Sequence, residues 1–430
     1  MVSETSAAGE PGGLRRSLGL TDAVVIGLGA MLGAGIFAAL APAARAAGPG
    51  LLLGLAVAAV VAYCNATSSA RLAARYPASG GTYVYGRERL GEFWGYLAGW
   101  CFVVGKTASC AAMALTVGAY AWPEYAHAVA AGAVVALTAV NYRGVQKSAL
   151  VTRVIVAIVL AVLAAVVVAA GFGDGPAPEP GSGPEISAGG VLQAAGLLFF
   201  AFAGYARIAT LGEEVRDPAR TIPRAIPLAL GITVVVYALV AAAALRTLGP
   251  DGLATATAPL SDVVEAAGAG WLVPMVRVGA VVAALGSLLA LILGVSRTTL
   301  AMARDRHLPH ALAAVHPRFA VPHRAELAVG AVVAITAATV DITAAIGFSS
   351  FGVLVYYAIA NVCAWTLAPS EGRPRRLIPV VGGTGCLLLA FGLPAQSVVT
   401  GTLVLALGAL VYAAHRRPGS TGTPGPDPGS

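Results

Sequence analysis

Long runs of apolar residues alternate with short polar segments along almost the whole chain. Most runs approach or exceed about 20 residues, the length that an α-helix needs to cross the hydrocarbon core of a bilayer. The pattern predicts about twelve membrane-spanning helices, at roughly 22–46, 51–70, 93–121, 126–142, 149–171, 189–212, 223–247, 270–302, 326–340, 342–368, 376–393 and 396–414. We therefore expect an all-α integral membrane protein.

Two of these runs are interrupted near their centres by small residues. Gly33-Ala34-Gly35 interrupts the first run, and Ala203-Gly204 interrupts the sixth. A break inside the bilayer leaves backbone amides and carbonyls that lipid does not satisfy, so it is tolerated only where it lines a protein cavity or holds a ligand. Corresponding breaks in the two halves of a chain are typical of secondary transporters.

The order of the runs predicts two five-helix repeats, at 21–171 and 189–368. Because each repeat has an odd number of spans, the second repeat crosses the membrane in the direction opposite to the first. The segment 172–188 contains acidic residues but no Arg or Lys, as expected of an external linker. Two further helices follow at 369–415.

The distribution of basic residues predicts the orientation. If the amino terminus is cytoplasmic, most of the 27 Lys and Arg residues fall in cytoplasmic loops, which places both termini inside. The formal charge of +7 then reflects orientation and contact with anionic lipid, so nucleic-acid binding is not needed to explain it. The polar tails at 1–20 and 416–430 are expected to be disordered, with no cleaved signal peptide. The Arg- and Ala-rich usage favours a bacterial plasma membrane.

The composition excludes a soluble protein. Hydrophobic residues make up 58% of the chain and charged residues 11%, with a mean hydropathy of +0.81. The five cysteines all lie in apolar runs, and none has a spacing typical of a metal site. We therefore expect free buried thiols, no metal and no cofactor.

The first break is suited to a zwitterion. Backbone amides at the start of the half-helix after it would stabilise a carboxylate, and carbonyls that lose their partners before it would accept hydrogen bonds from an ammonium. The alternative is a glycine face for close helix packing, which is common in membranes. The glycines also superficially suggest a dinucleotide-binding loop, but their spacing is wrong and no strand precedes them.

Five segments together resemble the amino acid–polyamine–organocation permeases. They are GAMLGAGIFAALAPAARAAGPG (29–50), RLAARYPASGGTYVYGRERLG (71–91), LLFFAFAGYARIATLGEEVRDPARTIPRAI (197–226), SRTTLAMARDRHLPHALAAVHPRFAVPHRA (296–325) and FSSFGVLVYYAIANVCAW (348–365). The resemblance implies the leucine-transporter-like fold of five plus five inverted helices. It also implies alternating access around a central amino-acid site.

The resemblance assigns the groups that would bind the substrate. Those for the carboxylate are the backbone amides of Ala34, Gly35 and Ile36. Those for the ammonium are the backbone carbonyls of Met31, Phe200 and Ala203, the last beside Gly204. The resemblance also makes the Phe200 side chain a gate over the substrate; the alternative is an ordinary core or lipid-facing phenylalanine.

Lys106 is the most singular residue, because the chain has only two lysines and this one lies in the middle of a span. An unpaired charge there costs about 2.5–3.5 kcal/mol even on the mild insertion scale, so we expect Lys106 to face the protein interior. It would touch the substrate, carry a proton as the coupling residue, or replace the cation of sodium-coupled relatives. The alternative is a structural lysine bonded to carbonyls of the broken helices.

The sequence lacks the residues that other classes of function require. The sequence has no HExxH motif, no paired intramembrane aspartates and no P-loop, which argues against an enzyme or an ATP-driven pump. No Asp or Glu lies clearly at the centre of any span, and Ala206 stands where many relatives have an acidic residue. Proton coupling would therefore have to use another group, for which Lys106 is the candidate. We favour proton-coupled amino acid uptake, with an exchanger or a non-transporting amino acid sensor as alternatives.

Overall fold

The computed structural model describes residues 18–76, 80–144, 149–173, 186–209, 211, 214–319 and 321–415. These residues are helical apart from the loops and one isolated bridge between Leu18 and Val215. The tails expected at 1–20 and 416–430 lie almost entirely outside the described residues, as does most of the linker expected at 172–188.

The structure contains seventeen α-helices in the described residues, together with short 3₁₀ turns. They are α1 (Leu20–Met31), α2 (Ala34–Ala38), α3 (Leu40–Ala47), α4 (Leu51–Arg75), α5 (Thr82–Leu90), α6 (Glu92–Ala121), α7 (Ala126–Tyr142), α8 (Ala149–Phe172), α9 (Ala188–Phe202), α10 (Ala206–Ala209), α11 (Pro218–Thr255), α12 (Pro259–Ala266), α13 (Val273–Arg304), α14 (His323–Thr339), α15 (Ile342–Trp365), α16 (Leu377–Gly392) and α17 (Ala395–His415).

Ten segments of the described chain are long and apolar enough to cross a membrane. They are Leu20–Ala38, Leu40–Arg75, Glu92–Ala121, Pro123–Tyr142, Leu150–Phe172, Ala188–Ala209, Pro218–Thr255, Gly270–Arg304, Ile342–Trp365 and Ala395–Ala414. The other two expected spans, 326–340 and 376–393, coincide with α14 and α16, which have 17 and 16 residues. These two helices are shorter than a typical span of about 20 residues.

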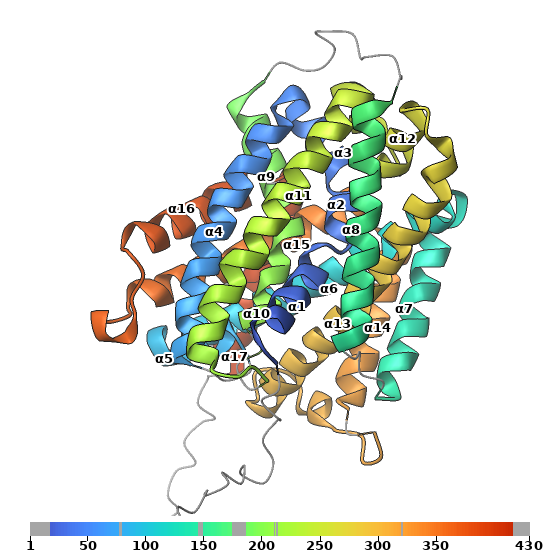
Figure 1. Ribbon diagram of the computed structural model, residues 1–430. Helices are drawn as coiled ribbons and strands as arrows, with labels where there is room; N and C mark the ends of the chain where they lie inside the picture. Colours follow the sequence, from blue (N-terminus) through green and yellow to red (C-terminus); the bar gives the residue numbers. More distant parts are fainter. Residues whose placement is uncertain are drawn as a thin grey trace, which may run out of the picture.

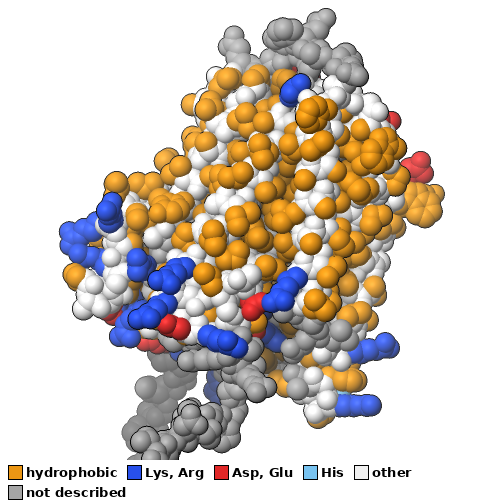
Figure 2. All heavy atoms as spheres, in the orientation of Figure 1, with side chains coloured by type: hydrophobic (Ala, Val, Ile, Leu, Met, Phe, Trp, Pro, Cys, Tyr) orange, Lys and Arg blue, Asp and Glu red, His pale blue; other side chains and the backbone are white. Residues whose placement is uncertain are grey.

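The outer surface has the character of a membrane protein. Figure 2 shows apolar side chains over most of one face, with Lys and Arg gathered toward its lower end. Leu388 on α16 and Leu403 on α17 are 61% and 65% exposed, which in water would be costly but in lipid is not. Trp122 and Trp271 are exposed in the loops before α7 and α13, as aromatic side chains often are at membrane interfaces.

The two broken segments lie inside the bundle (Figure 1). The first consists of α1 and α2, and the second of α9, the 3₁₀ turn η3 (Ala203–Tyr205) and α10. The first segment packs on α6, α8, α11 and α13, and the second packs on α4, α11 and α15. Residues at both breaks are buried, with Met31 1% and Phe202 0% exposed. The fold thus places the interrupted backbone away from lipid, where its polar groups can find partners.

A buried polar network joins α4, α15 and α16. The side-chain amide of Asn361 donates to Asn65 Oδ1 at 2.6 Å and to the carbonyl of Tyr357 at 2.9 Å. Asn361 Oδ1 accepts from the Ser68 hydroxyl at 2.7 Å, and Asn65 Nδ2 donates to Cys386 Sγ at 3.1 Å. The network holds three helices in register through groups that lipid would leave unsatisfied.

The short helix α5 is clamped between two loops at one end of the bundle. The Arg89 guanidinium donates to both carboxylate oxygens of Glu371, at 2.9 and 3.2 Å, and Arg75 Nε donates to the same carboxylate at 3.0 Å. On another side of α5, Arg87 donates to Asp305 at 2.7 Å. Glu371 follows α15 and Asp305 follows α13, so α5 links the ends of two long helices.

Candidate functional site

The first break separates α1 from α2. α1 ends at Met31, Leu32 has φ −75° and ψ 33°, and Gly33 has φ −86° and ψ −141° before α2 begins at Ala34. Ala39 keeps right-handed helical dihedrals, so α2 and α3 form one nearly continuous half-helix. The amides of Ala34, Gly35 and Ile36, all buried, therefore lie in the first turn of this half-helix, where amides lack intrahelical partners.

The second break separates α9 from α10. α9 ends at Phe202, and Ala203, Gly204 and Tyr205 form a 3₁₀ turn before the four residues of α10. A 3₁₀ turn shifts hydrogen bonds from i→i−4 to i→i−3 and so changes which carbonyls remain available. The break lies where the sequence predicted it.

The two breaks pack directly against each other. A Cβ at Gly35 would lie 2.5 Å from the Cα of Ala201, and a Cβ at Gly204 would lie 2.3 Å from the carbonyl oxygen of Ala30. Any larger residue at either glycine would push the two segments apart. The small residues at the breaks thus bring two backbone interruptions, distant in sequence, into contact.

Lys106 on α6 points into this junction. Its side chain is buried, with 7% of the residue exposed, and Nζ donates to the carbonyl oxygen of Ala203 at 3.3 Å. Such a bond to a broken helix is what we expected if Lys106 were a structural lysine. Because the Ala203 carbonyl is also one of the groups assigned to the substrate, the bond fits both interpretations of Lys106.

Tyr237 on α11 is a member of this junction that the sequence analysis missed. Its hydroxyl oxygen lies 2.5 Å from the carbonyl oxygen of Met31 and 3.2 Å from that of Ala201, so one phenol spans both broken segments. Its ring packs on Phe202 with 5.2 Å between centroids. The only signal in the sequence is a tyrosine inside the apolar run TVVVYALV, where a buried hydroxyl needs a partner.

Ser287 on α13 closes another side of the first break. Its hydroxyl donates to the carbonyl of Gly29 at 3.3 Å. A Cβ at Gly33 would lie 2.1 Å from Ser287 Oγ, so a glycine is needed for this approach. Side chains from α6, α11 and α13 therefore meet backbone carbonyls of the broken segments at three separate points.

Phe200, the expected gate, is buried on the last turns of α9 with 7% exposed. It belongs to the same apolar core as Met31, Ile36 and Ala203. The eight residues assigned from the sequence thus lie on α1, α2, α6, α9 and η3 around one junction. Movement of Phe200 as a gate stays a prediction.

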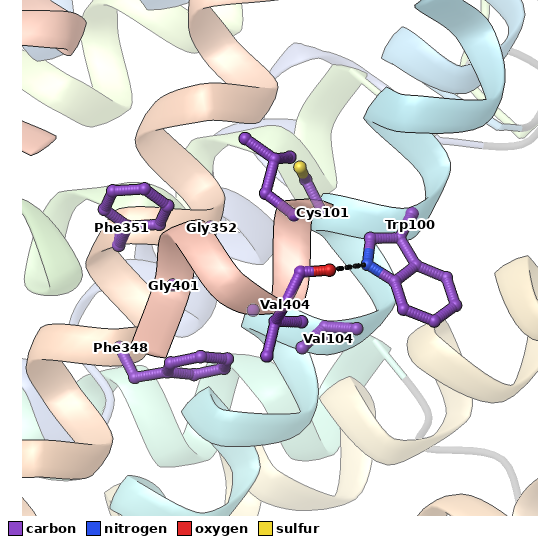
Figure 3. Close-up of a pocket in the computed structure, with 10 residues that line it drawn as sticks. Trp100, Cys101, Val104, Phe348, Phe351, Gly352, Gly401 and Val404 are labelled. Atoms are coloured by element: carbon purple, nitrogen blue, oxygen red, sulfur yellow. Dashed lines mark hydrogen bonds between the residues drawn. The ribbon is translucent and has the colours of Figure 1, made fainter. Parts of the chain in front are cut away.

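A small pocket lies elsewhere, between α6, α15 and α17 (Figure 3). Its volume of ≈ 20 Å³ is close to what one water molecule requires. Trp100 and Gly105 line it, and Trp100 Nε1 donates to the carbonyl of Val404 at 3.0 Å. At about 3.6 residues per turn, Lys106 faces the opposite side of α6, so the pocket is not part of the junction.

Residues 18–414 match the family described as amino acid permease. The chain belongs to the amino acid permease family. It is therefore a multi-pass membrane transporter and not an enzyme.

Individual relatives extend this result. The permease is 75% identical over 409 residues to an uncharacterized transporter of Mycobacterium tuberculosis (strain ATCC 25618 / H37Rv), covering 94% of this chain and 92% of the relative. It is 28% identical over 442 residues to the branched-chain amino acid permease of Bacillus subtilis (strain 168), covering 94% of each. It is 29% identical over 389 residues to cationic amino acid transporter 4 of Homo sapiens, covering 84% of this chain and 61% of the relative.

Proposed function

We propose that this permease moves amino acids across the plasma membrane by alternating access, as a proton-coupled uptake system. The substrate is held where the two broken segments meet. The observation that carries the proposal is the direct packing of the breaks, Gly35 on Ala201 and Gly204 on Ala30, with Lys106 bonded at the same place. Two interrupted helices in contact inside a bundle supply free backbone groups of both signs.

The groups at the junction suit the part that all amino acids share. The amides of Ala34, Gly35 and Ile36 bind the carboxylate, because they lie at the positive end of a half-helix dipole. The carbonyls of Met31, Phe200 and Ala203, beside Gly204, bind the ammonium. Burial of these residues supports the assignment, because hydrogen bonds from backbone groups are strengthened where water is excluded.

The proposal includes a topology of twelve spans, with α14 and α16 counted beside the ten long segments. Residues 21–171 and 189–368 form inverted five-helix repeats, and 369–415 adds two helices. An even number of spans puts both termini on the same side of the membrane, and the basic residues of the loops make that side the cytoplasm. The basic side chains gathered at one end of Figure 2 support this orientation.

Lys106 is the proposed coupling residue and Phe200 the proposed gate. Among the described residues Lys106 is the buried cation at the junction, and its carbon stem allows the amine to move between partners. A proton taken up from outside and released inside would drive accumulation of the substrate.

Uptake into proteoliposomes tests the proposal. A panel of labelled amino acids is offered with and without an inward proton gradient, to the native protein and to Lys106→Ala. We expect uptake of at least one amino acid, stimulated by the gradient, and loss of that stimulation in Lys106→Ala. Uptake only into vesicles preloaded with amino acid would indicate an exchanger, and binding without flux would indicate a sensor.

A further inference from the structure

Side chains bond two of the carbonyls that the proposed function gives to the substrate. The Ala203 carbonyl accepts from Lys106 Nζ at 3.3 Å, and the Met31 carbonyl accepts from Tyr237 at 2.5 Å. A lysine side chain ends in the same chemical group as the amino end of an amino acid. Lys106 thus places an amine at the ammonium position of the proposed site.

The bond matters most when the site is empty. A carbonyl at a helix break that faces neither water nor a donor is costly inside a membrane, so a carrier that closes without substrate needs another donor there. The buried Lys106 amine likewise needs a hydrogen-bond partner.

The packing of α6 fixes the backbone around Lys106, so movement at this position is confined to its flexible side chain. Gly105 packs closely on Gly352 of α15, and the hydroxyls of Ser109 and Ser349 share a hydrogen bond of 2.5 Å. These contacts flank Lys106 on the same helix, so the position of its Cα is set. The stem of Lys106, with four methylene groups, lets Nζ leave Ala203 without movement of α6.

We propose that Lys106 is an internal ligand that replaces the substrate ammonium on the Ala203 carbonyl and so allows the empty carrier to close and return across the membrane. This inference rests on the proposed function and extends it to the transport mode. With the internal ligand, the carrier completes its cycle without counter-substrate and performs net uptake. Without it, the empty carrier is held open, and only exchange of one amino acid for another continues.

This role differs from proton coupling. An amine donates a hydrogen bond whether or not it holds the additional proton, so the internal ligand does not need to titrate. A glutamine at position 106 keeps an N–H donor but carries no proton. It therefore separates the two roles in one variant.

The experiment compares net uptake with exchange in proteoliposomes at equal pH on both sides. The probes are labelled leucine, arginine and glutamate, each offered alone to empty vesicles and to vesicles preloaded with the same unlabelled amino acid. The variants are Lys106→Met, which keeps the length but removes the donor, and Lys106→Gln. Thr116→Val is the matched control, because it removes a buried hydroxyl of α6 that bonds only the carbonyl of Ala112 in its own helix.

For the native protein and Thr116→Val we expect net uptake and exchange of the same probe. In Lys106→Met we expect net uptake to fall about tenfold, since leaving a buried carbonyl without its donor costs roughly that factor. We expect exchange to stay within about threefold of the native rate, as substrate supplies its own ammonium. Lys106→Gln should recover part of the net uptake, without stimulation by a proton gradient.

Three results would overturn the inference while leaving transport intact. They are a native protein that only exchanges, a Lys106→Met variant whose net uptake and exchange both stay at the native rates, and a Lys106→Gln variant no better than Lys106→Met. Equal loss of both fluxes in a Lys106→Met protein that still unfolds at the native temperature would also contradict it. Absence of both fluxes in the native protein would instead refute the proposed function.

Discussion

The hydroxyl oxygen of Tyr237 lies 2.5 Å from the carbonyl oxygen of Met31 and 3.2 Å from that of Ala201. One side chain of α11 therefore holds both broken segments at the level of their interruptions. Because Tyr237 is 1% exposed, water does not compete for its proton. The bridge stabilises the contact between the two segments and must rearrange if they separate during transport.

Tyr237→Phe tests the bridge. The ring and its packing on Phe202 remain, while the donor to two buried carbonyls is removed. We expect a loss of about 0.5–1.5 kcal/mol in the free energy of unfolding, measured by thermal unfolding in detergent. The control is Tyr63→Phe, whose side chain is 50% exposed on the outer surface and should show no change. Equal stability of both variants would show that the bridge contributes nothing.

Gly35→Ala tests the contact between the breaks. Its new methyl group would lie 2.5 Å from the Cα of Ala201, closer than any real contact, so the segments must separate. Overpacking of this kind costs about 1–3 kcal/mol, and we expect lower thermal stability and loss of amino acid uptake. Gly231→Ala on α11 is the control, because a Cβ there meets nothing within 4 Å. Normal uptake by Gly35→Ala would contradict the packed junction.

The breaks and the position of Lys106 are predictable because each violates a strong rule. Small residues interrupt an apolar helix, and a lysine lies where lipid would leave its charge unpaired. Tyr237 violates no rule, since aromatic residues are common in buried helices, and its partner Met31 lies 206 residues away along the chain. Pairings at such separation depend on the three-dimensional path of the helices, which hydropathy does not contain.

The same limit applies to the exact ends of the helices and to the buried polar network. The pattern predicted spans at 326–340 and 376–393, where the structure has α14 with 17 residues and α16 with 16 residues, so the helix ends differ from the prediction by one to three residues. Asn65 and Asn361 appear in sequence as isolated polar residues in apolar runs. Only the packing of α4 on α15 shows that they satisfy each other.

Asn361→Ala tests that network. The substitution removes the amide donor to Asn65 Oδ1, which keeps only the weak thiol donor of Cys386 at 3.4 Å, and it removes the acceptor of the buried Ser68 hydroxyl. We expect a loss of about 1–3 kcal/mol in stability, read from thermal unfolding in detergent. Thr384→Val on α16 is the control, because that hydroxyl bonds only carbonyls of its own helix. Equal stability of Asn361→Ala and Thr384→Val would show that the network does not stabilise the protein.

Glu371→Gln tests the clamp on α5 through its pH dependence. The amide of Ala368, followed by the guanidiniums of Arg89 and Arg75, lowers the pKa of the Glu371 carboxyl from 4.5 to about 2. A pKa lowered by folding means that the charged carboxylate stabilises the folded state above its ordinary pKa, and that this contribution is lost as the pH falls toward the lowered value. Glutamine keeps the shape of the side chain but lacks the charge.

The unfolding temperature of Glu371→Gln should therefore lie below that of the native protein, by a constant amount from pH 8 to about pH 5.5. Between about pH 4.5 and pH 3 the difference should shrink, because protonation removes the same charge from the native protein. Glu88→Gln on α5 is the control, since Glu88 is exposed, and its unfolding temperature should match that of the native protein. A difference that persists unchanged at low pH would mean that the glutamine disturbs packing, and that the ion pairs with Arg89 and Arg75 do not clamp α5.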